Sequence, residues 1–458
     1  MTNLRLITIS VISTMTIVAC NTPKPQTTDK PFSKQMVEAH GLGNFACNKN
    51  KKHELATTGW DYVSGLVANA VLKTWEMYPE MTHYYDAVKA FADYSTSATG
   101  DSIFKAPKRI SALGESNIDD LAAGKIYFTL YKESLQRGDT ADATKYRNAV
   151  TMLRNKLKYD HSRIPKGLPG AGGFFHKRQY PCQMWLDGLY MGPALYAQWQ
   201  HEFGALEGDS ANMAAWSDIA HQFKTLHTHT YDTEKQLNYH AWSATPNDSN
   251  SFWANKTEPY LGCSKEFWGR GMGWYFAAMV DILEWMPKNH PDYNVILSNF
   301  HQVAAGLHRW QDKKTGLWYQ LLQYDSSMKG DSIGDTIDGK TFNIGTNPNY
   351  LEASASCMYT YVYYKAVRLG LLDATTYLPV AEKAYKGIIS NLITYNDANE
   401  IGISNICASA GLGPAKDHSR TGTTNYYLCG KDVTITYDEG KAIGPFIMAS
   451  LEKEMLTK

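Results

Sequence analysis

The stretch GRGMGWYFAAMVDILEWM at residues 269–286 decides the fold class, because a helix that is apolar on nearly every side must be buried. Two more stretches share this character: QMWLDGLYMGPALYAQW at 183–199 and SASCMYTYVYYKAV at 354–367. Residues 140–158 and 375–390 carry many more charges, which is typical of half-exposed helices. This alternation predicts an inner ring of helices wrapped by an outer ring.

Eleven helices are expected along the chain, and strand-like alternation is scarce. The helices should begin near residues 56, 81, 118, 140, 183, 210, 269, 292, 350, 375 and 441. No change of composition divides residues 51–458, so we expect one domain there, with a loop insertion at 330–348. Roughly 400 residues are many for a single core. A closed ring of helical hairpins solves this problem, since each hairpin adds its own slice of core.

The first twenty residues, MTNLRLITISVISTMTIVAC, have the pattern of a secretory signal that ends in a small residue before Cys20. The apolar run is too short and too polar for a membrane span, which needs about 20 apolar residues. We expect a bacterial lipoprotein, with a signal peptide at 1–19, lipidation at Cys20 and a flexible tether at 20–50. The protein would then be anchored to a membrane, facing the periplasm or on the outer membrane. An ordinary cleaved signal with an incidental cysteine is the alternative.

Composition excludes some functions and leaves others open. Positive and negative charges balance at 45 each, and no basic run is present, so we expect no nucleic-acid partner. The other six cysteines form no CxxC pair and HExxH is absent, so we expect neither a metal site nor a cofactor. The 12 Trp and 30 Tyr residues suit sugar binding and core packing equally well. Disulfide pairing and oligomeric state are not readable.

Consecutive hairpins would point all inner helices the same way, so their N-termini should meet at one mouth of the ring. Asp119, Asp187, Arg270 and Glu352 lie near such N-termini. Helix N-termini favour anions, and an acidic sugar would suit this mouth. Asp119 equally fits an N-cap, and Arg270 fits a structural ion pair. Asp187 is the strongest candidate for function, because a buried carboxylate without a task is costly.

Several long motifs resemble glycoside hydrolase family 105, the unsaturated rhamnogalacturonyl hydrolases. The resemblance covers about residues 55–455, in the expected order. One departure is NIDDLAAGK at 117–125, where the family often has Asn just before the small residue and glycine; the match of Asp119 is unaffected. The principal motifs are WLDGLYMGPALYA, FWGRGMGWYFAAMVD, TGLWYQ, NYLEASASCMYTYVYYKAVRLGLLD and IGPFIMASLE, with further matches in WDYVSGLV, FFHKRQYPCQ and YHAW.

The resemblance implies an (α/α)6 barrel and a substrate that carries a 4,5-unsaturated uronic acid at its non-reducing end. The reaction would hydrate the enol ether, with Asp187 protonating C4 and Asp119 positioning the acid or the water. Trp242 and Trp274 equally fit core positions. The residues implied to contact the substrate or wall its pocket are Tyr62, His176, Lys177, Trp185, His240, Trp242, Trp268, Arg270 and Trp274.

Within the resemblance, the substrate remains open. Unsaturated galacturonyl-rhamnose from pectin is the first expectation, and an unsaturated glucuronyl hydrolase acting on ulvan or glycosaminoglycan fragments is the alternative. Outside it, an ordinary two-carboxylate glycosidase would use Asp119 and Asp187 across a glycosidic bond. A non-catalytic sugar-binding lipoprotein would need the aromatic residues but no buried acid.

Overall fold

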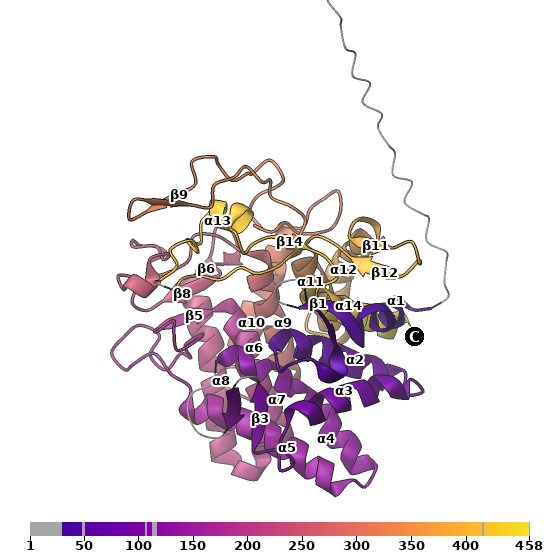
Figure 1. The fold of residues 1–458 in the computed structure, drawn as a ribbon. Helices are drawn as coiled ribbons and strands as arrows, with labels where there is room; N and C mark the ends of the chain where they lie inside the picture. The colour runs from indigo at the N-terminus through magenta and orange to yellow at the C-terminus, as the bar shows by residue number, and fades with distance from the viewer. Residues whose placement is uncertain (1–29, 48–50, 106–107, 112–116, 415, 458) are drawn as a thin grey trace, which may run out of the picture.

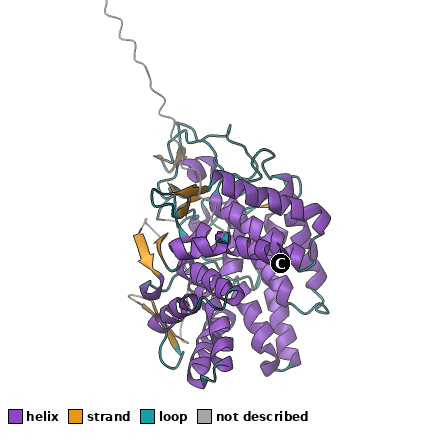
Figure 2. Ribbon diagram, turned by 90° about the vertical axis from the view of Figure 1, so that its right-hand side faces the viewer, coloured by secondary structure: helices purple, strands orange, loops and turns teal. Residues whose placement is uncertain are grey.

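The computed structural model describes residues 30–47, 51–105, 108–111, 117–414 and 416–457. It confirms the all-α class and the (α/α)6 barrel, because each inner helix contacts the next and the last contacts the first. Helices form the bulk of the molecule, with the short strands at its margin (Figure 2). The inner ring runs through α2 (Tyr62–Met77), η3 with α4 (Ile118–Lys125, Ile126–Gln136), α6 with α7 (Leu186–Met191, Pro193–Phe203), α9 (Gly269–Trp285), α11 (Ala353–Arg368) and α14 (Gly440–Thr457).

Outer helices alternate with the inner ones along the chain, as the sequence predicted. None of the described helices is long and apolar enough to cross a membrane. The five outer helices are α3 (Thr82–Ser95), α5 (Thr140–Asn155), α8 (Asp209–Thr230), α10 (Tyr293–Arg309) and α12 (Ala374–Asn391).

A short N-terminal segment lies at the sixth outer position, where the last inner helix meets the first. It consists of α1 (Phe32–Met36) and the π-helix η1 (Val37–Gly41), which pack on α14 and α2. Phe32 lies 6.1 Å from the ring of Phe446, and Ser33 Oγ donates to Glu454 at 2.9 Å.

The predicted tether over residues 20–50 is therefore too long. Met36, Val37 and Phe45 are fully buried in the main core, so the folded domain begins near residue 32 rather than 51. The predicted signal peptide and Cys20 lie outside the described residues.

The described strands pair in seven two-stranded antiparallel sheets. The pairs are β1 (Gly43–Cys47) with β2 (Lys51–Glu54), β3 (Ser102–Lys105) with β4 (Lys108–Ser111), β5 (Gln183–Trp185) with β8 (Ala241–Ser243), β6 (Tyr231–Asp232) with β7 (Leu237–Asn238), β9 (Asp335–Ile337) with β10 (Lys340–Phe342), β11 (Ile393–Tyr395) with β12 (Ile401–Ile403), and β13 (Ile406–Cys407) with β14 (Ile435–Thr436).

Three predicted helix starts are displaced, each for a local reason. The helix expected near residue 56 begins at Tyr62, after Asp61 caps it by accepting from the backbone N–H of Val63. The helix expected at 183 begins three residues later, because residues 183–185 pair as β5 with β8. The helix expected near 350 begins at Ala353, where the Glu352 side chain accepts from two backbone N–H groups.

The predicted loop insertion at 330–348 contains the β9–β10 hairpin and lies at the same end of the molecule as the short helix α13 (Thr424–Cys429) (Figure 1). Asp335 joins the two segments by accepting hydrogen bonds from the hydroxyls of Thr421 and Thr423 at 2.8 and 2.7 Å.

Candidate active site

Five inner helices each carry a charged residue at or near the N-terminus, as the ring geometry predicted. Asp61 caps α2, Asp119 lies in the first turn of η3, and Asp187 is the second residue of α6. Arg270 is the second residue of α9, and Glu352 caps α11. Charged groups from five inner helices are therefore placed at one end of the barrel.

Asp187 faces His240 across a buried contact. Its Oδ2 lies 3.2 Å from Nε2 of His240, and the His240 side chain is fully buried while that of Asp187 is about one-eighth exposed. Within the described part of the chain, neither of these two buried atoms has a hydrogen-bond partner, and at 3.2 Å each is the other's polar neighbour. A Cβ at Gly271 would lie 3.7 Å from Asp187 Oδ2 and 3.2 Å from His240 Cδ2, so α9 packs directly against the pair.

Asp119 is paired with Lys177 and His176, which come from the loop before β5. Its Oδ2 lies 2.6 Å from Lys177 Nζ, and its Oδ1 lies 3.8 Å from His176 Nε2. Burial alone would raise the pKa of Asp119, but the charges of Lys177 and His176 outweigh it and lower that pKa. Burial lowers the pKa of His176 to about 4. Asp119 is thus held as a carboxylate, which suits a positioning role better than proton donation.

Aromatic rings pack tightly around both carboxylates. Trp185 stacks on His176 at 4.2 Å and on Tyr180 at 4.9 Å, and its edge meets His240 at 5.4 Å. On its other side, His240 packs against Trp268 at 4.6 Å. The structure therefore brings Trp185, Trp268, His176 and His240 together around Asp187, and their contact with a substrate stays a prediction.

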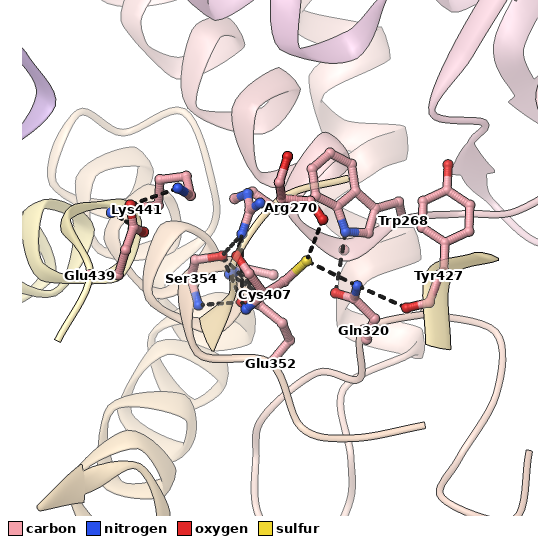
Figure 3. A network of polar contacts seen from close by, with 12 residues as sticks. Trp268, Arg270, Gln320, Glu352, Ser354, Cys407, Tyr427, Glu439 and Lys441 are labelled. Carbon is pink, nitrogen blue, oxygen red and sulfur yellow. Dashed lines mark hydrogen bonds and ion pairs between the residues drawn. The ribbon is translucent and has the colours of Figure 1, made fainter. Parts of the chain in front are cut away.

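Arg270 is embedded in a polar network that also contains Glu352, Ser354 and Cys407 (Figure 3). Its Nη1 donates to Ser354 Oγ at 3.2 Å and to the backbone carbonyl of Cys407, and lies 3.9 Å from Glu352 Oε1. Burial alone would lower the pKa of Arg270, but Cys407 and Glu352 raise it, so the guanidinium remains charged. Its cation also lies over the Trp268 ring at 4.8 Å.

Tyr62 and Trp274 form a layer next to these charged groups. Tyr62 is partly exposed and lies within electrostatic reach of Arg270 and Asp119, and burial raises its pKa. Its ring meets Trp274 at 6.2 Å, and Trp274 packs on Tyr190 at 4.7 Å. Trp274 follows Arg270 by one helical turn, so it lies beneath the mouth rather than at its rim.

Trp242 belongs to the core instead. Its ring stacks on His229 at 3.7 Å with an interplanar angle of 8°, and Gly170 and Gly262 approach it closely. Among the described residues, no ring contact joins Trp242 to Asp187 or to the rings around it. The expectation that Trp242 walls the pocket is therefore not supported; the pairing of β5 with β8 buries this ring beside α8.

Tyr427 was missed by the sequence reasoning. Its hydroxyl lies 2.7 Å from Nδ1 of His240, and its ring is fully buried beside Trp268. The two residues are 187 positions apart, and α13, which carries Tyr427, has only six residues. No local sequence pattern predicts a contact between residues so far apart.

No disulfide links the cysteines whose side chains the structure describes: Cys182, Cys263, Cys357, Cys407 and Cys429 are free. Nor do the described residues include a group of three or more His, Cys, Asp or Glu side chains placed to hold a metal ion.

Comparison with known proteins identifies the family. The sequence model of Glycosyl Hydrolase Family 88 matches residues 42–333 and 341–457. The chain belongs to this family. A solved glycoside hydrolase from family 105 of C. acetobutylicum ATCC 824 is 32% identical, with a TM-score of 0.73 over 93% of this chain and 100% of the other. The resemblance to family 105 is thereby confirmed, and the protein is a glycosidase.

The curated relatives with named activities include the following two. An unsaturated 3S-rhamnoglycuronyl hydrolase of Formosa agariphila is 25% identical over 257 residues, which is 54% of this chain and 57% of that protein. An unsaturated rhamnogalacturonyl hydrolase of Bacillus subtilis is 22% identical over 263 residues, which is 57% of this chain and 64% of that protein. Both relatives act on unsaturated uronides, according to their names.

Proposed function

We propose that this glycosidase removes a 4,5-unsaturated uronic acid from the non-reducing end of lyase-generated oligosaccharides. The observation that carries the proposal is the buried contact between Asp187 and His240, at the end of the barrel where helix N-termini gather. A buried carboxyl group held against a histidine side chain suits general acid catalysis, because its position toward the substrate is fixed. The names of the two curated relatives support the unsaturated substrate.

In the proposed reaction, Asp187 gives its proton to C4 of the sugar, and the electrons of the C4=C5 double bond form the new C–H bond. Positive charge develops at C5 and is shared by the ring oxygen. Water adds at C5 and gives a proton to the Asp187 carboxylate, which restores the acid for the next turnover. The resulting hemiketal opens and expels the neighbouring sugar. Protein groups alone carry the proton transfer.

Asp119 serves this reaction as a fixed negative charge. The Lys177 ammonium at 2.6 Å holds it in place, and its charge helps to lower the pKa of Asp119 despite burial. A carboxylate near the ring favours the positive charge that develops at C5, and it also accepts a hydrogen bond from the incoming water. Arg270, kept charged by its own network, supplies the counter-charge for the substrate carboxylate.

For the leaving sugar we propose rhamnose, with pectin-derived unsaturated galacturonyl-rhamnose as the first substrate. Rhamnose appears in the names of both curated relatives. The second candidate is an unsaturated glucuronyl substrate from ulvan or glycosaminoglycan fragments. The Formosa agariphila enzyme is named for a rhamnoglycuronyl rather than a rhamnogalacturonyl group, which keeps this candidate open.

An activity panel of lyase-generated disaccharides from pectin, ulvan, chondroitin and heparin tests this proposal. Loss of the ultraviolet absorbance of the unsaturated uronate reports turnover directly. We expect the highest kcat/KM on the pectin disaccharide. A preference for the ulvan fragment would select the second candidate, and no turnover of any member would contradict the function. A saturated aryl glycoside is the control, since only an ordinary glycosidase would cleave it.

We also propose that the enzyme works while anchored to a bacterial membrane through lipidated Cys20. The signal-like sequence of residues 1–20 supports this membrane localisation. The folded domain begins near residue 32, so only about a dozen residues separate Cys20 from the barrel. At about 3.5 Å per residue, that linker reaches at most ~40 Å.

A further inference from the structure

The chain of contacts behind the acid extends beyond His240. Oδ2 of Asp187 faces Nε2 of His240 at 3.2 Å, and Nδ1 of the same ring lies 2.7 Å from the hydroxyl of Tyr427. Both His240 and Tyr427 are fully buried, so no solvent can substitute for either contact. The three side chains come from α6, the segment before β8, and α13.

The hydroxyl of Tyr427 determines which nitrogen of His240 carries the hydrogen. A neutral imidazole has one donor and one acceptor nitrogen. Among the described residues, the Tyr427 hydroxyl has one hydrogen-bond partner, Nδ1 of His240. If Nδ1 carried the hydrogen, the buried hydroxyl hydrogen would be left without an acceptor, which is unfavourable. Tyr427 must therefore donate to Nδ1, and the ring hydrogen lies on Nε2.

That hydrogen arrangement has a consequence for the acid. With its hydrogen on Nε2, His240 places a donor 3.2 Å from Oδ2 of Asp187. Neither buried atom has a hydrogen-bond partner among the described residues, and the two align as a hydrogen bond when the substrate complex tightens the site. Oδ2 then acts as an acceptor, so the proton of the acid must lie on Oδ1. The opposite tautomer would present a lone pair to Oδ2, attract the acid's proton there, and turn it away from the substrate.

We infer that Tyr427 is a positioning residue: it fixes His240 as the Nε2–H tautomer, and His240 in turn keeps the reactive proton of Asp187 on Oδ1. This inference rests on the proposed role of Asp187 as the acid. Gln320 and Trp268 hold Tyr427 in place, because Gln320 Nε2 donates to its backbone carbonyl at 3.4 Å and Trp268 stacks beside its ring (Figure 3).

Substitution of Tyr427 by Phe tests the inference, since it removes the hydroxyl and keeps the ring. We expect kcat to fall ~10- to 100-fold, the usual effect of losing a group that orients a histidine, while KM changes less than ~3-fold. Tyr275→Phe is the matched control. The hydroxyl of Tyr275 also meets a histidine Nδ1, that of His227 at 3.1 Å, but outside the group around Asp187. This control should keep the wild-type kcat.

A double-mutant cycle separates positioning from simple structural support. Glutamine has no tautomers, so Tyr427→Phe introduced into the His240→Gln variant should cost less than ~3-fold in kcat, since the hydroxyl acts only through the imidazole. If the two losses multiply instead, Tyr427 does not act through His240 and the inference is overturned. An undiminished kcat in Tyr427→Phe alone would overturn it as well.

Nitrogen-15 NMR of the wild-type enzyme with labelled histidine reads the tautomer without any substitution at Tyr427. The His240 signals are assigned by their absence in His240→Gln. We expect hydrogen on Nε2, and hydrogen on Nδ1 would overturn the inference even if Tyr427→Phe failed to fold. The spectrum requires no turnover, so it stands apart from the proposed function, whose failure would show as full activity in Asp187→Asn.

Discussion

Replacement of Asp187 by Asn should nearly abolish turnover without disturbing the fold. The amide has almost the shape of the carboxyl group. In the wild type, Oδ2 of Asp187 lies 3.2 Å from Nε2 of His240, and the amide oxygen of the variant can take the same place. Its NH2 group would then face the substrate, and it cannot give a proton to carbon. General acid catalysis contributes about 10²- to 10⁴-fold, which equals ~3–5 kcal/mol of activation free energy.

The assay follows the loss of absorbance of the unsaturated disaccharide at saturating substrate, and calorimetry measures the Kd of the same compound. We expect kcat to fall at least ~100-fold, while Kd and the thermal unfolding midpoint stay close to wild type. Asp281→Asn is the control, because Asp281 is also buried on an inner helix but pairs with Lys365 at 2.7 Å, about 16 Å along α9 from Arg270. It should lose stability and keep kcat. An Asp187→Asn enzyme with more than a tenth of the wild-type kcat would refute the role of Asp187.

Three further predictions concern the charged residues around the site and the membrane anchor. Glu352→Gln should lower the free energy of unfolding by about 3–5 kcal/mol, because it leaves the buried Arg270 without a counter-ion; urea unfolding measures this, and a loss under about 1 kcal/mol would contradict it. Lys177→Met should make the free energy of unfolding depend less on pH. In the wild type, the lowered pKa of Asp119 contributes stability at pH values above the unfolded-state pKa of about 4. That stability is lost as the pH falls through the lower folded-state pKa. Thermal unfolding at pH 7 and pH 3 should show a smaller difference for the variant than for wild type, and an equal one would count against the pair. Cys20→Ala should move the protein from the membrane fraction to the soluble fraction, and undiminished membrane association would contradict the lipid anchor.

The helical part of the fold was predictable because its signal is local. An apolar surface on all sides, as at 269–286, requires burial whatever the partners are. The alternation of buried and charged helices then fixes two rings, and the common direction of the inner helices gathers Asp119, Asp187 and Arg270 at one end. These conclusions need only periodicity and short connections.

What the sequence could not predict depends on pairing between distant segments. Residues 183–185 have a helical pattern, yet they pair with 241–243 as a strand, and this pairing buries Trp242 beside His229. The segment at 32–47 is short and partly polar, so the burial of Met36 and Phe45 depends on packing against α14 and α2. Tyr427 reaches His240 only because the fold brings α13 against the segment before β8, 187 positions away in the sequence.

The central claim is that Asp187 protonates carbon rather than a glycosidic oxygen. Turnover in heavy water tests it most directly, because C4 of the released uronate receives the acid's exchangeable hydrogen. The account predicts deuterium at C4 in product analysed before slow exchange next to the keto group, together with loss of the C4=C5 double bond. Product that retains the double bond, or that forms in heavy water without deuterium at C4, would contradict the account even if the expected sugar were released.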